Sequence, residues 1–538
     1  MIKTGSQIVM ECLLEQGVDV VFGYPGGAAL AIYDALFEYS SSIRHILTTH
    51  EQHAAHAADG YARATGKVGV ALSTSGPGAT NLLTGIAAAY MDSVPVVAIT
   101  CNVGKNDIGK DSFQEVDIFS ISMPVTKHNF LVRDIRDLAP TLRKAFAIAA
   151  SGRPGPVLVD ILCDVTTDSC HFQPQTVKKT APSIASDDLD FSGALALINE
   201  STCPMIYAGG GIVASGAEQA LLAFSEKIKA PVALTLMGIG CFPPTHPHYA
   251  GMLGLFGSQQ SAKSTDECDL LIAIGTRFSD RTVPCPETFA PGAKILHIDV
   301  DPAEINKNVR CHMSLLGDAR LLLEQLTAHV SAKAENPLLA NISPAKAIPA
   351  PAEGDTLRPD SLLALLGSLA GEDQLYTTEV GENQLWAARW LPVVGSRRFI
   401  TSGGLGAMGF GLGAAIGAAV ATGSRVINIA GDASFYMNMA ELSTLAAYDL
   451  PIIQVVLNNR SLGLVRQMQT DRYDGRLSAV DFDRPTDLTA LAAAFGIGCD
   501  RIQTVGQAEA AIQKALAAKG PFLLECMIDP AEPVPGWN

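Results

Sequence analysis

The chain has 538 residues, 48% of them hydrophobic and 17% charged, a composition typical of a large, well-buried α/β enzyme. Its formal net charge of −16 at pH 7 argues against nucleic acid or a membrane surface as a partner. Eleven cysteines without a CxxC pair exclude a disulfide framework and predict a reducing, cytoplasmic setting.

The first part of the chain alternates helical and strand patterns. Residues 1–17 form an amphipathic pattern whose Glu11 and Glu15 are unlike a signal or transit peptide, so we expect an ordinary helix. Short hydrophobic runs then predict strands at 68–74, 95–100 and 155–161. Helices between such strands indicate a parallel sheet, and we expect a first α/β domain over residues 1–170.

The stretch THEQHAAHAADGYARATG places three histidines around Glu51. The zinc-protease pattern requires a second histidine four residues after His50, where this chain has Ala54. His53 and His56 share one helix face, but two ligands alone make a poor metal site. The residues themselves leave two alternatives open: a solvated helix start, or a lone carboxylate that handles a proton.

Two polar stretches divide the rest of the chain. We expect linkers from Thr166 to Asp188 and from Ser331 to Gly354, because Pro, Ala and polar residues dominate there. The first linker precedes a central domain over residues 190–332, and the second precedes a third domain over residues 355–538. Strand patterns in these parts lie at 204–211, 231–236, 268–275, 293–301, 425–432, 451–459 and 521–528. We therefore predict three α/β domains, each with a central, mostly parallel sheet.

The segment GLGAMGFGLGAAIGAAVAT, residues 404–422, has no charged residue and imitates a membrane span. Its apolar character comes largely from glycine and alanine, whereas a span needs about 20 mostly large apolar residues. We therefore predict a close-packed, buried helix and no membrane association. The segment contains GLGAMG, a match to GxGxxG, but lacks the strand and acidic partner of a dinucleotide site.

The most informative local pattern is AGDASFYMNMAELSTLAAYDLPIIQVVLNN, which begins at Ala430. It predicts strand, helix and strand, with Asp432 after the first strand and Asn459 after the second. Because parallel strands end at one sheet edge, both side chains should face one point, where open α/β folds bind ligands. Their oxygens suit a Mg²⁺ ion that bridges a diphosphate, and we favour this interpretation over two separate strand caps.

This pattern resembles the signature of thiamine diphosphate (ThDP) enzymes, in which GDG or GDA precedes a double Asn at this distance. The resemblance extends along nearly the whole chain and is greatest to the catalytic subunits of acetohydroxyacid (acetolactate) synthases. The segments that carry it are FGYPGGAALAIYDAL, HAADGYARATGKVGV, TSGPGATNLLTGIA, DSFQEVDI, SGRPGPVLVDI, RFSDRT, TSGGLGAMGFG and NNRSLGLVRQ. It implies a pyrimidine-binding domain, an FAD-type central domain and a diphosphate-binding domain, in chain order.

The resemblance also implies a coenzyme site. Glu51 would be buried against the aminopyrimidine ring of ThDP, whose own amino group then acts as the base. Mg²⁺ would be held by Asp432, Asn459 and the carbonyl oxygen of Ser461, and Met408 would support the bent coenzyme. The other positions that match the coenzyme side are Gln114, Gly381, Glu382, Asn383, Gly406, Gly431, Ala433 and Ser434.

The central domain would bind FAD, although the flavin performs no redox step in the synthase reaction. Glycines there would permit close approach of the backbone to a diphosphate, and an acidic residue after a strand can hold a ribose hydroxyl. The matching positions are Arg153, Gly209, Gly210, Gly211, Thr235, Leu236, Gly275, Arg277, Arg281, Asp299, Gly317 and Asp318.

The reaction implied by the resemblance is decarboxylation of pyruvate on ThDP and transfer of the hydroxyethyl unit to a second 2-ketoacid, pyruvate or 2-ketobutyrate, in branched-chain amino-acid biosynthesis. Phe113 and Val380 would line an apolar pocket that favours loss of carbon dioxide, and Arg277 would hold the acceptor's carboxylate. The family works as homodimers or homotetramers in which Glu51 completes the site of a neighbouring subunit. Many members also bind a small regulatory subunit.

Several positions differ from the usual synthase. Met468 stands where the family has Trp, so we expect little preference for 2-ketobutyrate over pyruvate as acceptor. Glu382 and Asn383 replace a Gln-His pair, and a carboxylate beside the diphosphate would repel it unless the side chain turns away. Further replacements are Phe256 for His, Cys163 for Lys, Met123 for Arg and His53 for Gly. The alternatives are an FAD-linked pyruvate oxidase, another ThDP carboligase with a different acceptor, or a paralogue without turnover.

Overall fold

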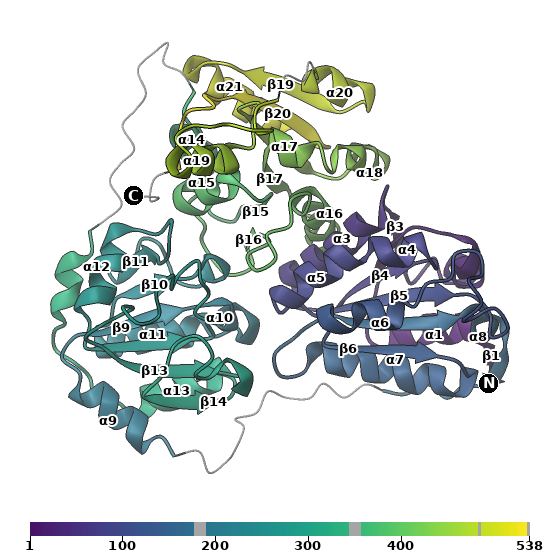
Figure 1. Cartoon of the computed structure of the whole chain (residues 1–538), viewed down its shortest axis with the longest axis horizontal. Helices are drawn as coiled ribbons and strands as arrows, with labels where there is room; N and C mark the ends of the chain where they lie inside the picture. The colour runs from purple at the N-terminus through teal and green to yellow at the C-terminus, as the bar shows by residue number, and fades with distance from the viewer. Residues whose placement is uncertain (177–189, 344–356, 483–485, 535–538) are drawn as a thin grey trace.

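The computed structural model describes residues 1–176, 190–343, 357–482 and 486–534, and it forms three α/β units (Figure 1). Each unit contains a six-stranded, wholly parallel sheet with helices packed on it. The predicted fold class is therefore confirmed. All ten predicted strands are present, each with bounds within three residues of the expected range.

The N-terminal sheet has the strand order β3-β2-β4-β5-β7-β6. Its strands are β2 (Val20–Gly23), β3 (Arg44–Leu47), β4 (Gly69–Ser73), β5 (Val96–Asn102), β6 (His128–Val132) and β7 (Val157–Leu162). Its helices are α1 (Gly5–Glu15), α2 (Leu30–Glu38), α3 (Glu51–Thr65), α4 (Pro77–Asn81), α5 (Leu83–Met91), α6 (Ile118–Ser122), α7 (Ile135–Ala150) and α8 (Cys163–Thr167). The predicted first helix is present as α1, and the Thr4 side chain caps it by accepting a hydrogen bond from the Gln7 backbone.

One linker prediction was partly wrong. Strand β1 (Ile2–Thr4) pairs antiparallel with β8 (Ser169–His171), inside the stretch expected to be a linker. The pairing continues where the Phe172 backbone donates to the carbonyl oxygen of Met1, and the Phe172 ring is buried. Residues 177–188 of that expected linker lie outside the described residues, as do residues 344–354 of the second.

The central sheet has the order β11-β10-β9-β12-β13-β14. Its strands are β9 (Pro204–Ala208), β10 (Val232–Leu234), β11 (Tyr249–Met252), β12 (Leu270–Ile274), β13 (Lys294–Asp299) and β14 (Met313–Leu316). The helices are α9 (Ser192–Glu200), α10 (Gly210–Ser215), α11 (Glu218–Ile228), α12 (Gln259–Glu267) and α13 (Ala319–His329), with 3₁₀ turns η3 (Leu236–Gly238), η4 (Pro302–Glu304) and η5 (Pro337–Asn341).

The C-terminal sheet has the order β16-β15-β17-β18-β20-β19. Its strands are β15 (Leu375–Thr378), β16 (Phe399–Ile400), β17 (Val426–Gly431), β18 (Ile452–Asn458), β19 (Gly498–Ile502) and β20 (Phe522–Met527). Its helices are α14 (Pro359–Ala370), α15 (Glu382–Trp390), α16 (Gly411–Thr422), α17 (Asp432–Phe435), α18 (Leu442–Ala447), α19 (Gly463–Arg472), α20 (Leu488–Ala494) and α21 (Val505–Ala517), with the 3₁₀ turn η6 (Met439–Glu441).

Helices α3 and α16 form the seam between the N-terminal and C-terminal units, and they lie side by side in Figure 1. Their backbones touch, because a Cβ on Gly60 would collide with the carbonyl oxygen of Ala414 and one on Gly417 with that of Ala57. Residues 411–419 are all buried, so the uncharged segment is a close-packed interior helix, as predicted. In the parts of the chain that the structure describes, every helix lacks the length or the hydrophobicity needed to reach across a bilayer.

Candidate functional site

The carboxyl edge of the C-terminal sheet brings the predicted metal ligands together. Strands β17 and β18 are neighbours, with Gly431 opposite Leu457, so Asp432 and Asn459 follow adjacent strands. Both side chains are buried, at 1% and 7% exposure. The Asn459 Oδ1 accepts a hydrogen bond of 3.0 Å from the Ser461 backbone, which holds the turn that follows β18. The donor set of carboxylate, amide and backbone oxygens suits Mg²⁺.

The segment after β15 lies at the same edge. Gly381 has φ of +140°, a conformation that side-chain-bearing residues rarely adopt, and Glu382 follows as the first residue of α15. The Glu382 carboxyl is buried and accepts a hydrogen bond of 3.2 Å from the Asn459 amide. Burial raises the pKa of Glu382 to about 8, against the opposing charge of Arg466. The side chain therefore turns toward Asn459.

Two further residues on this edge use their side chains locally. The Asn383 amide donates to the carbonyl oxygens of Glu379 and Ile429, at 2.9 and 3.0 Å, so it joins the segment after β15 to β17. The Ser434 hydroxyl donates to the Gly431 carbonyl oxygen at 3.0 Å. Ala433, which precedes Ser434, is buried. A coenzyme role for Asn383 and Ser434 would therefore fall to their backbone.

The loop that carries Met408 is fixed by two acids that the sequence pattern did not single out. Asp92, from the N-terminal unit, accepts the backbone N–H groups of Gly403 and Gly404 at 3.0 and 2.7 Å. Glu379 accepts the N–H of Gly409 at 2.7 Å, and also that of Leu412 in the first turn of α16. Gly406 adopts φ of +68°, and Met408 is partly buried.

Glu379 is fully buried, and both of its carboxylate oxygens are engaged. One oxygen accepts from Gly409, and the other accepts from Leu412 and from the Asn438 side-chain amide. Burial raises the pKa of Glu379 to about 7, against the opposing effect of these three donors. No local motif marks this residue, since its partners lie 30 or more positions away in the chain.

Glu51 is the first residue of α3 and is buried. Its Oε2 accepts a hydrogen bond of 2.9 Å from the Asn81 amide. A Cβ on Gly78 would lie 3.2 Å from Oε1, so α4 leaves little space beside the carboxyl. Glu51 does not line the large cavity that lies where the three units meet.

The three neighbouring histidines have structural roles. The His50 ring caps α3 by accepting from the Gln52 backbone, and His53 lies 2.8 Å from Glu441 across the seam. His56 packs edge-on against Phe410, and burial lowers its pKa to about 3. Within residues 1–176, 190–343, 357–482 and 486–534, no group of three His, Cys, Asp or Glu side chains could hold a metal ion.

The loop of residues 104–117 presents two of the predicted site residues. Phe113 is 88% exposed, and Gln114 has φ of +60°. Glu115 organises the loop by accepting the backbone N–H groups of Gly109, Lys110 and Ser112. Within a single chain, Phe113 is therefore exposed and does not line the apolar pocket that was expected.

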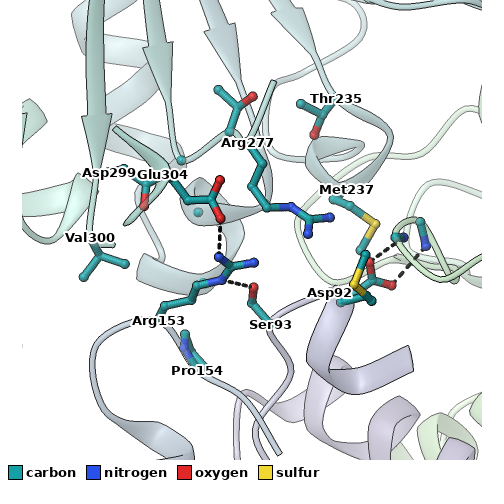
Figure 2. A pocket seen from close by; sticks show the side chains of 18 of the residues that line it. Asp92, Ser93, Arg153, Pro154, Thr235, Met237, Arg277, Asp299, Val300 and Glu304 are labelled. Carbon is teal, nitrogen blue, oxygen red and sulfur yellow. Dashed lines mark hydrogen bonds and ion pairs between the residues drawn. The ribbon is translucent and has the colours of Figure 1, made fainter. Parts of the chain in front are cut away.

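A cavity of about 2280 Å³ lies where the three units meet (Figure 2). Asp92 and Ser93 from the N-terminal unit and Gln384 and Leu464 from the C-terminal unit contribute to its wall. The residues singled out by the sequence that line it are Arg153, Gly210, Gly211, Thr235, Leu236, Phe256, Gly275, Arg277, Arg281, Asp299, Gly317, Asp318, Gly406 and Met468. The cavity is larger than the roughly 300–1,000 Å³ typical of ligand pockets, so it has room for a dinucleotide at the carboxyl edge of the central sheet.

Arg277 extends into this cavity between Glu304 and Met237 (Figure 2). Within the described part of the chain, no ion pair engages its guanidinium. Met468 lies on α19, on the wall formed by the C-terminal unit. The cavity thus brings the predicted acceptor-binding Arg277 and the predicted acceptor-discriminating Met468 to one space.

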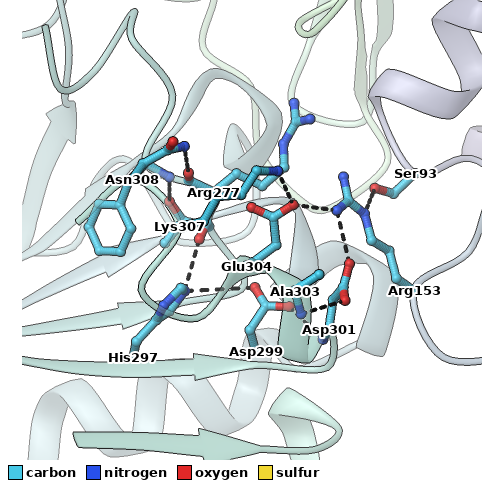
Figure 3. A network of polar contacts seen from close by, with 12 residues as sticks. Ser93, Arg153, Arg277, His297, Asp299, Asp301, Ala303, Glu304, Lys307 and Asn308 are labelled. Carbon is cyan, nitrogen blue, oxygen red and sulfur yellow. Dashed lines mark hydrogen bonds and ion pairs between the residues drawn. The ribbon is translucent and has the colours of Figure 1, made fainter. Parts of the chain in front are cut away.

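Arg153 is held by carboxylates across the boundary between the N-terminal and central units (Figure 3). It donates to Ser93 in its own unit at 2.8 Å, and to Asp301 and Glu304 at 3.1 and 2.6 Å. Nearby, Asp299 ends β13, and burial raises its pKa to about 6. The predicted cofactor role of Arg153 thus competes with this ion-pair network.

Two of the predicted glycines have a structural task in the central unit. Gly209 does not line the cavity, and a Cβ there would collide with the Gly275 carbonyl oxygen. A Cβ on Gly211 would lie 2.5 Å from the Gly275 Cα. These glycines let two backbone segments of the central unit approach each other, whatever binds beside them. Asp318 likewise has a local task, since its carboxylate caps α13.

Comparison with known proteins gives matches along the whole chain. Family models match for the N-terminal thiamine pyrophosphate binding domain over residues 3–121, the central domain of thiamine pyrophosphate enzymes over 191–326, and their C-terminal thiamine pyrophosphate binding domain over 379–526. Each range lies within one of the three units.

Similar proteins cover nearly the full length. The probable acetolactate synthase large subunit of Methanocaldococcus jannaschii is 44% identical, with 99% of this chain and 93% of that protein aligned. The acetolactate synthase isozyme 2 large subunit of Escherichia coli K12 is 43% identical over 98% and 96%. The acetolactate synthase large subunit of Parasynechococcus marenigrum is 46% identical over 92% and 82%.

Proposed function

Because the chain belongs to the thiamine-diphosphate-dependent enzymes, and among them to the acetolactate synthase large subunits, we propose that it forms acetolactate from two molecules of pyruvate. One pyruvate loses carbon dioxide, and its remaining two-carbon unit forms a carbon–carbon bond with the keto carbon of the second. The observation that carries the proposal is that Asp432 and Asn459 are buried and directly follow the carboxyl ends of two adjacent parallel strands. The names of the relatives favour this reaction over a flavin-linked pyruvate oxidase.

The residues that would hold the coenzyme lie at the C-terminal sheet edge. Asp432, Asn459 and the carbonyl oxygen of Ser461 would hold Mg²⁺, and the backbone at Gly381 and Ala433 would face the diphosphate. When bound, thiamine diphosphate supplies a carbon nucleophile and takes up the electrons released as carbon dioxide leaves. The chain's own part is to place the reacting groups and exclude water.

Glu51 is the residue that would handle the proton. Its carboxyl is buried at the start of α3 and is held by the Asn81 amide. A buried carboxyl of fixed orientation can share a proton with a ring nitrogen, which is the task that the coenzyme's aminopyrimidine requires. In the proposal Glu51 performs it for the coenzyme of a neighbouring subunit.

The acceptor would bind near Arg277 and Met468, which share one cavity. The Arg277 guanidinium can hold the acceptor's carboxylate through two parallel hydrogen bonds. We further propose that FAD occupies the central part of this cavity without a redox step, since Asp299 after β13 suits a ribose hydroxyl.

The assembly is part of the proposal. The relatives are called large subunits, and we propose that this chain, like them, pairs with a small regulatory subunit. Its own copies would form a dimer or a tetramer. We place the enzyme in the cytoplasm, in keeping with its unpaired cysteines.

The test is to replace Glu51 with Gln. The wild-type protein with pyruvate, thiamine diphosphate and Mg²⁺, with and without FAD, should release acetolactate, identified by mass spectrometry. Glu51→Gln should lower kcat by more than about a hundredfold, because general acid–base groups contribute roughly 10²–10⁴-fold. Glu38→Gln, an exposed glutamate on α2, is the matched control and should keep wild-type turnover.

Near-normal acetolactate formation by Glu51→Gln would contradict the role of Glu51. Oxygen consumption with pyruvate in place of acetolactate would contradict the proposed reaction.

A further inference from the structure

Glu382, Asn459 and Gly463 form a small cluster beside the proposed metal site, in which the Glu382 and Asn459 side chains are buried. They come from the start of α15, the end of β18 and the start of α19. The Asn459 Nδ2 donates to the Glu382 Oε2 at 3.2 Å. A Cβ on Gly463 would overlap that same Oε2 and lie 2.7 Å from the Asn459 Nδ2. Position 463 therefore leaves room for the carboxyl only because it is glycine.

An asparagine amide has two ends of nearly equal size and opposite hydrogen-bonding character. In Asn459, the NH₂ end faces Glu382, and the carbonyl oxygen faces the Ser461 backbone N–H at 3.0 Å. A carbonyl oxygen has two lone pairs, so Oδ1 keeps one for a metal ion after it accepts from Ser461. A rotated amide would present its NH₂ group to the metal instead, and NH₂ cannot serve as a ligand.

We propose that Glu382 is a positioning residue that fixes the orientation of the Asn459 amide so that its oxygen faces the Mg²⁺ site. The inference rests on the proposed function, in which Asn459 is a metal ligand. It assigns a task to a residue whose carboxyl accepts a hydrogen bond from Asn459. Groups behind metal ligands typically change metal affinity about 10- to 100-fold when they are removed.

The experiment measures Mg²⁺ affinity rather than turnover. Thiamine diphosphate is titrated into the full chain by calorimetry at a series of Mg²⁺ concentrations, which gives the apparent dissociation constant of Mg²⁺. Glu382→Ala should raise this constant about 10- to 100-fold. Glu382→Gln should stay within about threefold of wild type, because its amide oxygen can still accept from Asn459.

Gly463→Ala provides a second variant that keeps Glu382. Its Cβ would displace the carboxyl, so we expect the same loss of Mg²⁺ affinity as in Glu382→Ala. In the double variant the space is free again, and its affinity should be no lower than that of Glu382→Ala alone. Such non-additivity is the sign that the two residues act through one contact.

The neighbouring asparagine, Asn458, has a glutamate partner of its own, which provides a matched control. Glu525 is buried and accepts a hydrogen bond of 2.7 Å from Asn458, the residue that precedes Asn459. Glu525→Ala should lower the thermal midpoint but leave the Mg²⁺ affinity of the remaining folded protein near wild type. Equal loss of Mg²⁺ affinity in Glu525→Ala and Glu382→Ala would overturn the inference, because it would show a general loss of structure.

Other outcomes separate the inference from the proposed function. If the wild-type chain binds thiamine diphosphate without any dependence on Mg²⁺, and Asp432→Ala changes nothing, the proposed function fails. If the wild type needs Mg²⁺ but Glu382→Ala binds it equally well, only the inference is overturned. Loss of affinity in Glu382→Gln as large as in Glu382→Ala, or additive losses in the double variant, would overturn it too.

Discussion

At the scale of single residues, burial raises the pKa of several carboxyl groups, among them Asp299, Glu379 and Glu382. Glu379 shows the balance most clearly, because complete burial disfavours its charged form while three hydrogen-bond donors favour it. Burial prevails, and the pKa lies at about 7. The unfolded chain binds this proton only below its ordinary pKa of 4.5, so the folded state holds the proton over the interval between the two values.

This balance predicts a pH dependence of stability. A raised pKa in the folded state means that the stability contributed by Glu379 is complete below about pH 4.5 and is lost as the pH rises through about 7. The free energy of unfolding of wild type, relative to Glu379→Gln, should therefore fall over that range, by on the order of 3 kcal/mol. Urea unfolding at several pH values measures it. A difference that stays constant with pH would show that Glu379 titrates normally.

A second residue-scale prediction concerns acceptor choice. Met468 lines the cavity that Arg277 enters, and a rigid aromatic wall there should favour the longer acceptor. Met468→Trp should raise the ratio of acetohydroxybutyrate to acetolactate, at equal 2-ketobutyrate and pyruvate, by about 10- to 100-fold, the range expected for a contact of roughly 1–3 kcal/mol. Val465→Trp is the control, because Val465 lies on the exposed face of α19. An unchanged ratio in Met468→Trp would contradict the assignment of this wall.

The residues that sequence reasoning could find are those with local signatures. Asp432 and Asn459 follow strand patterns, and Glu51 stands in a long motif. Glu379 and Asp92 have no such mark, because their partners come from other segments and only the folded chain brings them together. The direction of the Glu382 side chain was equally hidden, since it depends on the absence of a side chain at position 463.

At the scale of elements, the loop of residues 104–117 depends on acids that tie down its backbone. Glu115 accepts three N–H groups inside the loop, and Asp164 accepts the N–H of Lys105 at its start. These hydrogen bonds lower the pKa of Glu115, and the bond from the Gly109 backbone has the largest effect. The carboxylate thus stays ionised and holds the loop at neutral pH.

Glu115→Gln removes one of the two acceptor oxygens and should loosen the loop that presents Phe113 and Gln114. We expect faster cleavage of the loop in limited proteolysis and a decrease in kcat/KM for pyruvate of up to about a hundredfold, as misplaced site residues typically cause. Asp107→Asn, in the same loop, is the control, since its carboxylate accepts no hydrogen bond from a described residue. Wild-type proteolysis and kinetics in Glu115→Gln would refute the role.

Most strands in the middle of each sheet were predicted, with β2 and β15 as exceptions, whereas the edge strands were not. Strands such as β5 and β18 are continuous hydrophobic runs, because parallel strands are buried on both faces. Edge strands such as β3 and β16 are short and only partly buried, and no hydrophobic run marks them. Strand β8 was missed for a different reason, because its pairing partner β1 lies at the other end of the unit.

At the scale of the whole molecule, the proposed sharing of each coenzyme site between two subunits can be tested by mixing variants. If each coenzyme is served by Glu51 of one subunit and Asp432 of the other, two inactive variants should complement each other. An equal mixture of Glu51→Gln and Asp432→Ala chains, refolded together, should recover about a quarter of wild-type activity, from the intact sites of the mixed dimers. Activity no higher than that of the separate variants would contradict a shared site.

The seam between α3 and α16 has a consequence for how such subunits communicate. Glu51 begins one of these helices, and the other begins three residues after Met408. Their contacting backbones therefore link the proposed proton-handling residue to the proposed coenzyme support. Two helices in such close backbone contact can shift or tilt only together. If the site is shared between subunits as proposed, a displacement of α3 at one coenzyme site would therefore also move the α16 helix that begins at the other.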